Sequence, residues 1–296
     1  MSAEATQSLR VDTAEMPRES VIFGSTALMR KIRVKVEEAL GSTKPLLIQG
    51  ESGTGKDLIS LFVHAHSILS AGPFVKLNCA AMSNGLLEAE LFGVEKDAST
   101  SAAECRRGAL EAAEGGILFL DEIGEMDLAS QAKLLGVLGD GHFSRVGGRG
   151  ELVAHLRVIC ATRCDLEAAV ARRAFRQDLF SSLNSIRIQL PPLRERREDI
   201  PLICNYLLGK LSHIYGKPEL QLSESAFEIL QQWRWPGNTR ELENWIARIV
   251  VFGTEEVLGL EFARQLASMS TIGQRKHRIV HLRAGAAKRT RRPHGG

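Results

Sequence analysis

The residues with the clearest chemical potential form a glycine-rich loop at positions 50–57, with the sequence GESGTGKD. Glycine lets a backbone turn tightly and bring its N–H groups against an anion, and a helix that begins at the loop adds its positive end. The lysine of such a loop reaches the terminal phosphates of a nucleotide. We therefore expect the whole loop to bind phosphate: Gly50, Glu51, Ser52, Gly53, Thr54, Gly55, Lys56 and Asp57.

Two carboxylates, Asp121 and Glu122, follow an apolar run at residues 117–120. In a phosphate-transfer site one acidic residue holds the water shell of Mg²⁺, and a second polarises the attacking water. We predict the first role for Asp121 and the second for Glu122. The pair alone is also typical of a buried strand with a polar end, but the phosphate loop upstream favours the catalytic interpretation.

Two other residues could act on the same phosphates. Thr162 follows the apolar run 156–161, so it would lie between the other strand ends and sense the γ-phosphate; the alternative is a solvated loop residue. Arg176 precedes a predicted helix and could stabilise transition-state charge in a neighbouring subunit. The alternative for Arg176 is a surface salt bridge.

Arg240 is a further candidate. It lies in the first turn of a predicted helix that Asn238 would cap. A cation is unfavourable at this end of a helix unless a negative group lies nearby. That group is either a nucleotide phosphate or a carboxylate such as Glu243.

A parallel sheet would bring these residues together. Short apolar runs alternate with amphipathic helical patterns, which predicts an α/β fold with helices on both faces and a nucleotide at the carboxyl ends of the strands. The expected strands are residues 46–48, 74–77, 117–120, 156–161 and 186–190. The expected helices between and before them are residues 26–40, 57–70, 84–92, 128–138 and 165–173.

The pattern changes after Pro191 and Pro192, where an all-helical segment begins. Its expected helices are residues 199–215, 223–233 and 238–252. We thus predict four regions: a disordered segment at residues 1–20, an α/β ATPase subdomain at 21–192, a helical lid at 193–262 and a disordered basic tail at 263–296.

Charge and composition exclude several classes of protein. The 296 residues contain no apolar run of membrane-spanning length, and the first twenty residues lack a signal-peptide pattern, so we expect a cytoplasmic protein. The five cysteines contain no C-x-x-C pair and are expected to be buried free thiols. Residues 264–296 hold nine of the 38 basic side chains and no acidic ones, which would allow nonspecific DNA contact.

Four motifs together resemble the AAA+ ATPase domain of the sigma-54-dependent, NtrC-type transcription activators. The motifs are GESGTGKD, GALEAAEGGILFLDEI, FRQDL followed by QLPPLRERREDIP, and WPGNTRELEN. The resemblance covers residues 21–252 and implies an AAA+ P-loop NTPase with a five-stranded parallel sheet and a small C-terminal helical lid. It further implies ATP and Mg²⁺ as ligands, a hexameric ring of identical subunits, and remodelling of sigma-54 RNA polymerase.

The resemblance also implies roles for individual residues. Asn78 would restrain Glu122 until the site is ready. Arg176 would reach into a neighbour's site, and Arg240 would be the sensor of the lid.

The sequence departs from the family at several positions. Residues 97–102 read DASTSA where the family has the sigma-contacting loop GAFTGA. Arg163 replaces an asparagine, and Ser182 replaces a second arginine; either change could slow hydrolysis. Residues 264–296 show no pattern for a DNA-reading helix-turn-helix.

Three functions remain open from these residues. The first is an ATP-hydrolysing activator of sigma-54 transcription. The second is a nucleotide-dependent regulatory or assembly protein that binds ATP without remodelling sigma-54, and the third is a decayed paralogue.

Overall fold

The computed structural model describes residues 6–9, 16–95 and 105–256. They belong to two compact units, residues 1–206 with 231–242 and residues 207–230 with 243–296. None of the described helices is long and apolar enough to cross a membrane. The four predicted regions, with the lid beginning at residue 193, stay a prediction.

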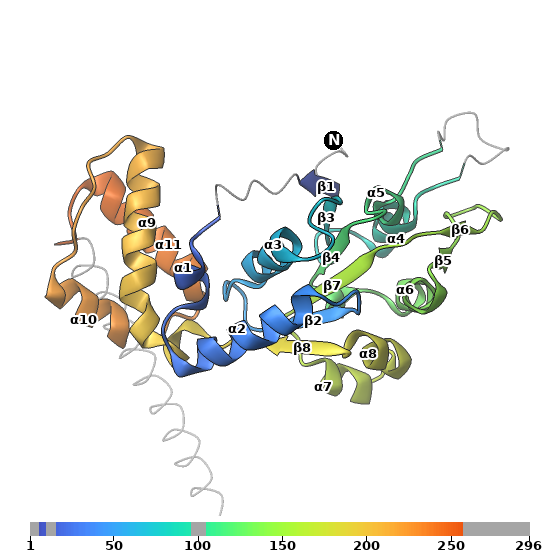
Figure 1. Cartoon of the computed structure of the whole chain (residues 1–296), viewed down its shortest axis with the longest axis horizontal. Helices are drawn as coiled ribbons and strands as arrows, with labels where there is room; N and C mark the ends of the chain where they lie inside the picture. The colour runs from blue at the N-terminus through green and yellow to red at the C-terminus, as the bar shows by residue number, and fades with distance from the viewer. Residues whose placement is uncertain (1–5, 10–15, 96–104, 257–296) are drawn as a thin grey trace, which may run out of the picture. The chain divides into compact units, whose positions relative to one another are not determined.

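The first unit is built on one six-stranded sheet (Figure 1). In spatial order its strands are β1 (Thr6–Leu9), β3 (Phe74–Asn78), β4 (Ile117–Asp121), β7 (Arg157–Thr162), β2 (Leu46–Gln49) and β8 (Ile186–Gln189). The five predicted strands are all present and parallel, which confirms the predicted sheet. β1 is an addition: it pairs antiparallel with β3 in a segment where we expected disorder.

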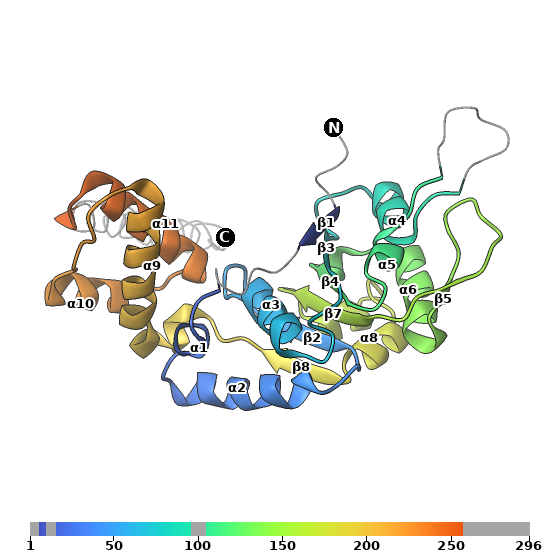
Figure 2. The same cartoon turned by 45° about the horizontal axis from the view of Figure 1, so that its top comes forward.

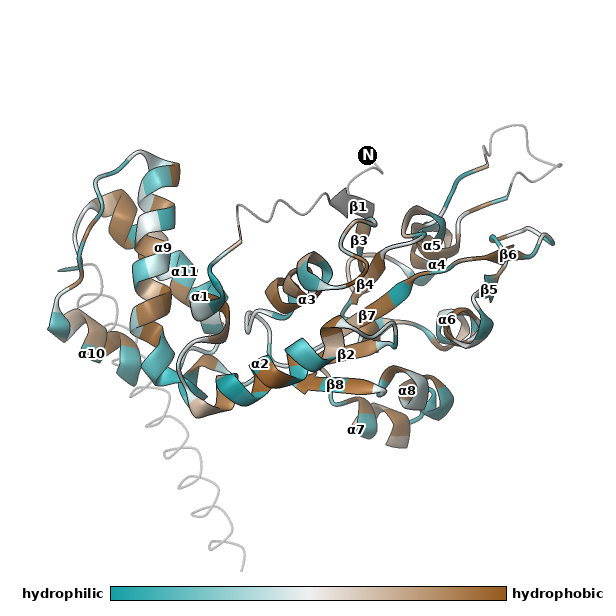
Figure 3. Ribbon diagram, in the orientation of Figure 1, coloured by the Kyte–Doolittle hydropathy of each residue, from teal (hydrophilic) through white to brown (hydrophobic). Residues whose placement is uncertain are grey.

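Alternating side chains of the strands point to two separate cores. On β4, Ile117 and Phe119 join one core, whereas Leu118 and Leu120 join the other. All four are fully buried, as expected of a strand covered on both faces. Figure 3 shows the resulting apolar band along the central strands.

Helices cover both faces of the sheet (Figure 2). One face packs against α1 (Glu19–Phe23), α2 (Ala27–Leu40) and α3 (Lys56–His66). The other face packs against α4 (Asn84–Phe92), α5 (Ala109–Ala112), α6 (Leu128–Asp140), α7 (Leu166–Ala171) and α8 (Gln177–Leu183). Ile32 and Val36 of α2 are buried, whereas Leu28 of the same helix is 42% exposed.

Short elements complete the first unit. The strands β5 (His142–Phe143) and β6 (Leu152–Val153) form a separate antiparallel pair. A 3₁₀ turn, η2 (Ile123–Glu125), follows β4 directly, and two more, η3 (Leu193–Glu195) and η4 (Arg197–Asp199), follow β8.

The chain after Pro192 is helical, as predicted, with α9 (Ile200–Tyr215), α10 (Glu224–Gln232) and α11 (Asn238–Phe252). Ser223 caps α10 by accepting a hydrogen bond from Ala226 N. The predicted cap of α11 is wrong. Asn238 is buried and in the left-handed region at φ 53°, and its side chain bonds to Leu193 and to the phosphate loop. Glu241 instead reaches back to accept from Gly237 N.

Candidate nucleotide-binding site

The phosphate loop joins the end of β2 to the start of α3, as the sequence predicted. Gly53 and Gly55 adopt φ of 76° and 101°, a region that side chains with a Cβ rarely enter. Gly53 is also crowded, because a Cβ there would lie 2.3 Å from the carbonyl oxygen of Gly237. The loop conformation therefore requires glycine at residue 53 for two reasons: its φ angle is positive, and there is no room for a Cβ.

The Lys56 side chain lies inside this loop. Its Nζ donates to the carbonyl oxygens of Gly50 at 2.9 Å and Glu51 at 3.1 Å. Burial lowers the pKa of Lys56, while the negative charges of Glu122 and Asp121 oppose that shift. The ammonium group thus donates to two neutral carbonyl oxygens. A phosphate oxygen, which is charged and therefore a stronger acceptor, can take their place.

Asp121 ends β4 with its carboxylate at the same edge of the sheet. Its Oδ1 accepts from Glu122 N at 3.0 Å. Burial raises the pKa of Asp121, and the nearby charge of Asp57 adds to the rise. Mg²⁺ prefers carboxylate oxygens as ligands. A cation here would offset the cost of burying the charged Asp121 carboxylate, so Asp121 fits the predicted metal role.

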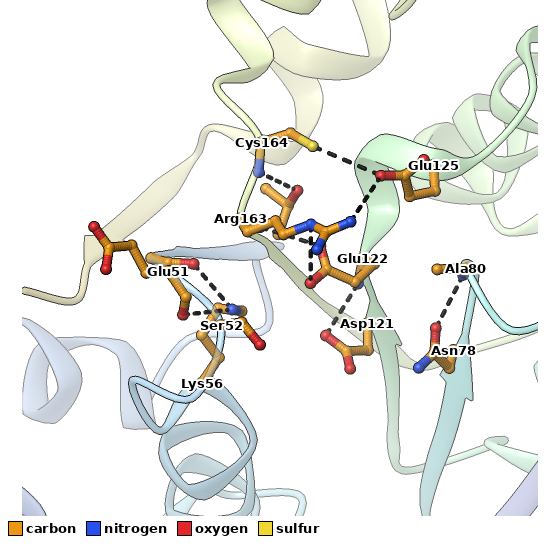
Figure 4. Close-up of polar contacts among 12 residues, drawn as sticks. Glu51, Ser52, Lys56, Asn78, Ala80, Asp121, Glu122, Glu125, Arg163 and Cys164 are labelled. Carbon is orange, nitrogen blue, oxygen red and sulfur yellow. Dashed lines mark hydrogen bonds and ion pairs between the residues drawn. The ribbon is translucent and has the colours of Figure 1, made fainter. Parts of the chain in front are cut away.

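Glu122 has a strained backbone, with φ 53° in a residue that carries a Cβ. Such strain is typical of functional positions. Its Oε2 accepts from Arg163 N at 3.1 Å, and its Oε1 lies 4.0 Å from Arg163 Nε (Figure 4). The carboxylate is therefore oriented by the residue that follows β7.

Asn78 makes a different contact from the one we expected. It ends β3 opposite Asp121, and its Oδ1 accepts from Ala80 N at 2.9 Å. Within the described residues its side chain has no hydrogen bond to Glu122. The role of Asn78 as a restraint on Glu122 stays a prediction.

Thr162 ends β7, which runs between β4 and β2. Its side chain is fully buried, and Oγ1 accepts from Cys164 N at 3.0 Å. It is therefore not a solvated loop residue. The sheet order brings Thr162, Lys56 and the two carboxylates to neighbouring strand ends, and the sensing role itself remains a prediction.

Asp57, the first acidic residue of α3, pairs with a lysine on β3. Its Oδ2 lies 2.6 Å from Lys76 Nζ. This pairing partly neutralises the extra negative charge that Asp57 brings to the edge of the site.

Arg240 faces the phosphate loop from the start of α11. Its Nη1 donates to Ser52 Oγ at 3.0 Å. Glu243, the alternative partner that we considered, accepts instead from Lys210. The contact with Ser52 places a cation beside the loop, as a nucleotide-sensing arginine requires.

Two arginines that the sequence analysis did not identify also contact the phosphate loop. Both lie in the charged run after Pro192. Arg194 makes a two-pronged ion pair with Glu51, at 2.8 and 2.6 Å. This pair lowers the pKa of Glu51 to about 2, with help from Asn238 and against the effect of burial. Arg196, which is buried, donates to Thr54 O at 3.1 Å. In the sequence these two arginines are marked only by the charged cluster RERRED. Their partners could not be predicted from it, because they lie more than 140 positions earlier.

Arg176 lies at the start of α8 with a half-exposed side chain. Its Nε and Nη2 lie 3.0 and 2.6 Å from the carboxylate oxygens of Asp178. This ion pair raises the pKa of Arg176 and lowers that of Asp178. The structure thus contains the surface salt bridge that we gave as the alternative, and the action of Arg176 in a neighbouring subunit stays a prediction.

A parallel sheet with a phosphate loop after β2 and carboxylates at the end of β4 is typical of P-loop NTPases, and the helical segment after β8 is typical of their AAA+ class. Residues 22–189 match the sigma-54 interaction domain, and residues 194–277 match an AAA+ ATPase lid domain. The chain belongs to the sigma-54 interaction domain family, as its motifs predicted.

Relatives of the chain are bacterial regulatory proteins. The Nif-specific regulatory protein of Azotobacter vinelandii is 46% identical over 80% of this chain and 45% of its own length. The regulatory protein AtoC of Escherichia coli is 46% identical over 80% of this chain and 51% of its own. The chain therefore spans about half the length of the curated relatives it matches.

Solved structures agree with the fold. NtrX from Brucella abortus in complex with ADP superimposes with a TM-score of 0.73 and 36% identity, over 78% of this chain and 51% of that one. The same protein in complex with ATP gives the same TM-score over 50% of its chain. Hsp104 of S. cerevisiae, at 17% identity and a TM-score of 0.58, shares the fold alone.

Proposed function

We propose that this chain binds ATP with Mg²⁺, hydrolyses it, and uses the energy to activate transcription by sigma-54 RNA polymerase. The observation that carries the proposal is the convergence of Lys56, Asp121, Glu122 and Thr162 at the carboxyl ends of neighbouring strands. The family of the chain and the ADP and ATP complexes of NtrX support the same assignment.

Each residue has a part in this proposal. The loop N–H groups and Lys56 bind the phosphates, and Arg240 contributes a second cation beside Ser52. Asp121 would hold Mg²⁺ through water, and the ion would neutralise charge on the phosphate oxygens. Glu122 polarises the attacking water, and Thr162 senses the γ-phosphate.

The partners are part of the same proposal. We propose a ring of identical subunits, a hexamer as in the family, in which Arg176 reaches a neighbour's phosphates. The exposure of Arg176 supports this, since its ion pair with Asp178 is open to solvent and easily exchanged. The sigma-contacting segment 97–102 and the basic tail that we considered for DNA contact lie outside the described residues.

Among the three functions left open by the sequence, the family and its relatives favour the ATP-hydrolysing activator. Nothing in the described residues favours the regulatory protein without remodelling activity or the decayed paralogue. The phosphate loop and both carboxylates are intact, whereas a decayed site is free to lose them.

The test compares ATP binding and ATP turnover in two variants of the full chain. Lys56→Ala should lose ATP binding, because it removes the cation that lies inside the loop. Glu122→Gln should retain binding and lose about 10²-fold or more in kcat. Lys35→Ala, which removes an exposed lysine of α2, is the matched control.

Normal ATP affinity in Lys56→Ala would contradict the placement of the phosphates. Normal turnover in Glu122→Gln would contradict the role of the carboxylate.

A further inference from the structure

The turn after β7 holds the carboxylate that we propose as catalytic. Arg163 N donates to Glu122 Oε2 at 3.1 Å, and the guanidinium of the same residue lies near two carboxylates. Its Nε is 4.0 Å from Glu122 Oε1, and its Nη2 is 3.7 Å from Glu125 Oε1. Figure 4 shows the guanidinium between Glu122 and Glu125, at the edge where Lys56 and Asp121 also lie.

The backbone of this turn is fixed by close packing. Cys164 N donates to Thr162 Oγ1, and a Cβ on Gly124 would lie 3.1 Å from the Cys164 Cβ. Residues 162–164 thus pack directly on η2, where Glu125 lies. The N–H of Arg163 has little freedom to leave Glu122.

The side chain of Arg163 is free by comparison. It is 56% exposed, and both of its ion pairs are long. Glu122, with 15% of its side chain exposed, is the more confined partner. The guanidinium can therefore leave Glu122 without disturbing the fold.

We propose that Arg163 is a positioning residue whose guanidinium restrains the Glu122 carboxylate and so lowers the rate at which the site hydrolyses ATP. An uncharged side chain at this position would form no such ion pair. While the ion pair holds the carboxylate, Oε1 of Glu122 is directed towards Arg163 rather than towards the attacking water, so the pair keeps hydrolysis slow. The inference rests on the proposed ATPase function.

The experiment measures kcat and KM for ATP in the full chain carrying Arg163→Ala, Arg163→Gln or Arg163→Lys. The two neutral variants should raise kcat about two- to fivefold, the size expected from losing one exposed ion pair, with KM unchanged. Arg163→Lys keeps the charge and should stay near the wild-type rate. The matched control is Arg187→Ala, which breaks an exposed ion pair with Glu167 outside the site.

A lower kcat or a higher KM in the neutral variants would overturn the inference, because it would mean that Arg163 contacts the nucleotide productively. An unchanged kcat would overturn it too. In both cases wild-type turnover would leave the ATPase function standing. If wild type and neutral variants all bind ATP and none turns it over, the proposed function itself fails. Turnover that appears only in the neutral variants would support the restraint most strongly.

Discussion

Glu51 brings a negative charge into a loop that is built to bind anions, and Arg194 balances it. The two oxygens of Glu51 each accept from one nitrogen of the guanidinium. This arrangement leaves the loop close to neutral and orients it from the segment after β8. The ion pair also makes the stability of the loop depend on pH.

We predict that Glu51→Gln makes the protein less stable near neutral pH and that this difference shrinks in acid. The pKa of Glu51 falls from an ordinary 4.5 to about 2 in the folded state. A lowered folded pKa stabilises the fold above the unfolded value, and this contribution is lost as the pH falls from 4.5 towards about 2. Urea unfolding of both proteins between about pH 7 and pH 3 measures the difference.

The control for this prediction is Glu228→Gln, which changes an exposed residue of α10. Its stability relative to wild type should change little over the same pH range. A constant difference between wild type and Glu51→Gln at every pH would contradict the ion pair as the cause.

The chemistry of single residues could be predicted only where it follows from local spacing. Lys56, Asp121 and Glu122 stand at fixed offsets from apolar strands, so their positions in the site followed from the sequence. Arg194 could not be found in this way, because its partner Glu51 is 143 positions away. The contact of Asn78 with Ala80 was also missed, since it depends on the local turn rather than on the strand.

At the scale of elements, the segment just before α2 is held by the buried carboxylate of Asp199, a residue more than 170 positions later in the chain. Asp199 accepts from Ser25 N and Oγ and from Thr26 N and Oγ1, at 2.7 to 3.1 Å. Asp199 is fully buried and also offsets the charge of buried Arg196. One side chain thus joins α2 to the segment that holds the phosphate loop.

We predict that Asp199→Ala lowers the free energy of unfolding by about 2–4 kcal/mol, since it leaves several donors of Ser25 and Thr26 unsatisfied just before α2. Urea unfolding monitored by circular dichroism measures the loss. Asp140→Ala, at an exposed carboxylate that ends α6, should change it by about 0.5 kcal/mol or less. Equal losses in the two variants would refute this stabilising role of Asp199.

Hydrophobic periodicity was sufficient to predict the parallel strands and most of the helices. The continuous apolar run of β4 follows from burial of both faces of the strand, and the 3.6-residue period of α2 follows from burial of one face of the helix. β1 was missed because an edge strand of four residues needs no apolar pattern of its own. Asn238 was misassigned because a good capping residue also suits a buried polar junction.

At the scale of the whole molecule, the proposed action of Arg176 requires that sites be completed between copies of the chain. We predict that Arg176→Ala and Glu122→Gln are each nearly inactive alone and recover part of the ATP turnover when mixed. In a mixed ring some sites would combine an intact Glu122 with an intact Arg176 from the neighbour. Turnover that equals the sum of the separate variants would argue against an arginine supplied in trans.

We propose that ATP hydrolysis at this site drives activation of sigma-54 RNA polymerase. The most direct measurement is the formation of heparin-resistant open complexes by sigma-54 polymerase, with this protein and ATP, on a sigma-54 promoter. We predict open complexes with wild type and ATP, and none with ADP or with Glu122→Gln. ATP turnover by wild type without any open complex would contradict the claim and assign the chain to nucleotide-dependent regulation without remodelling.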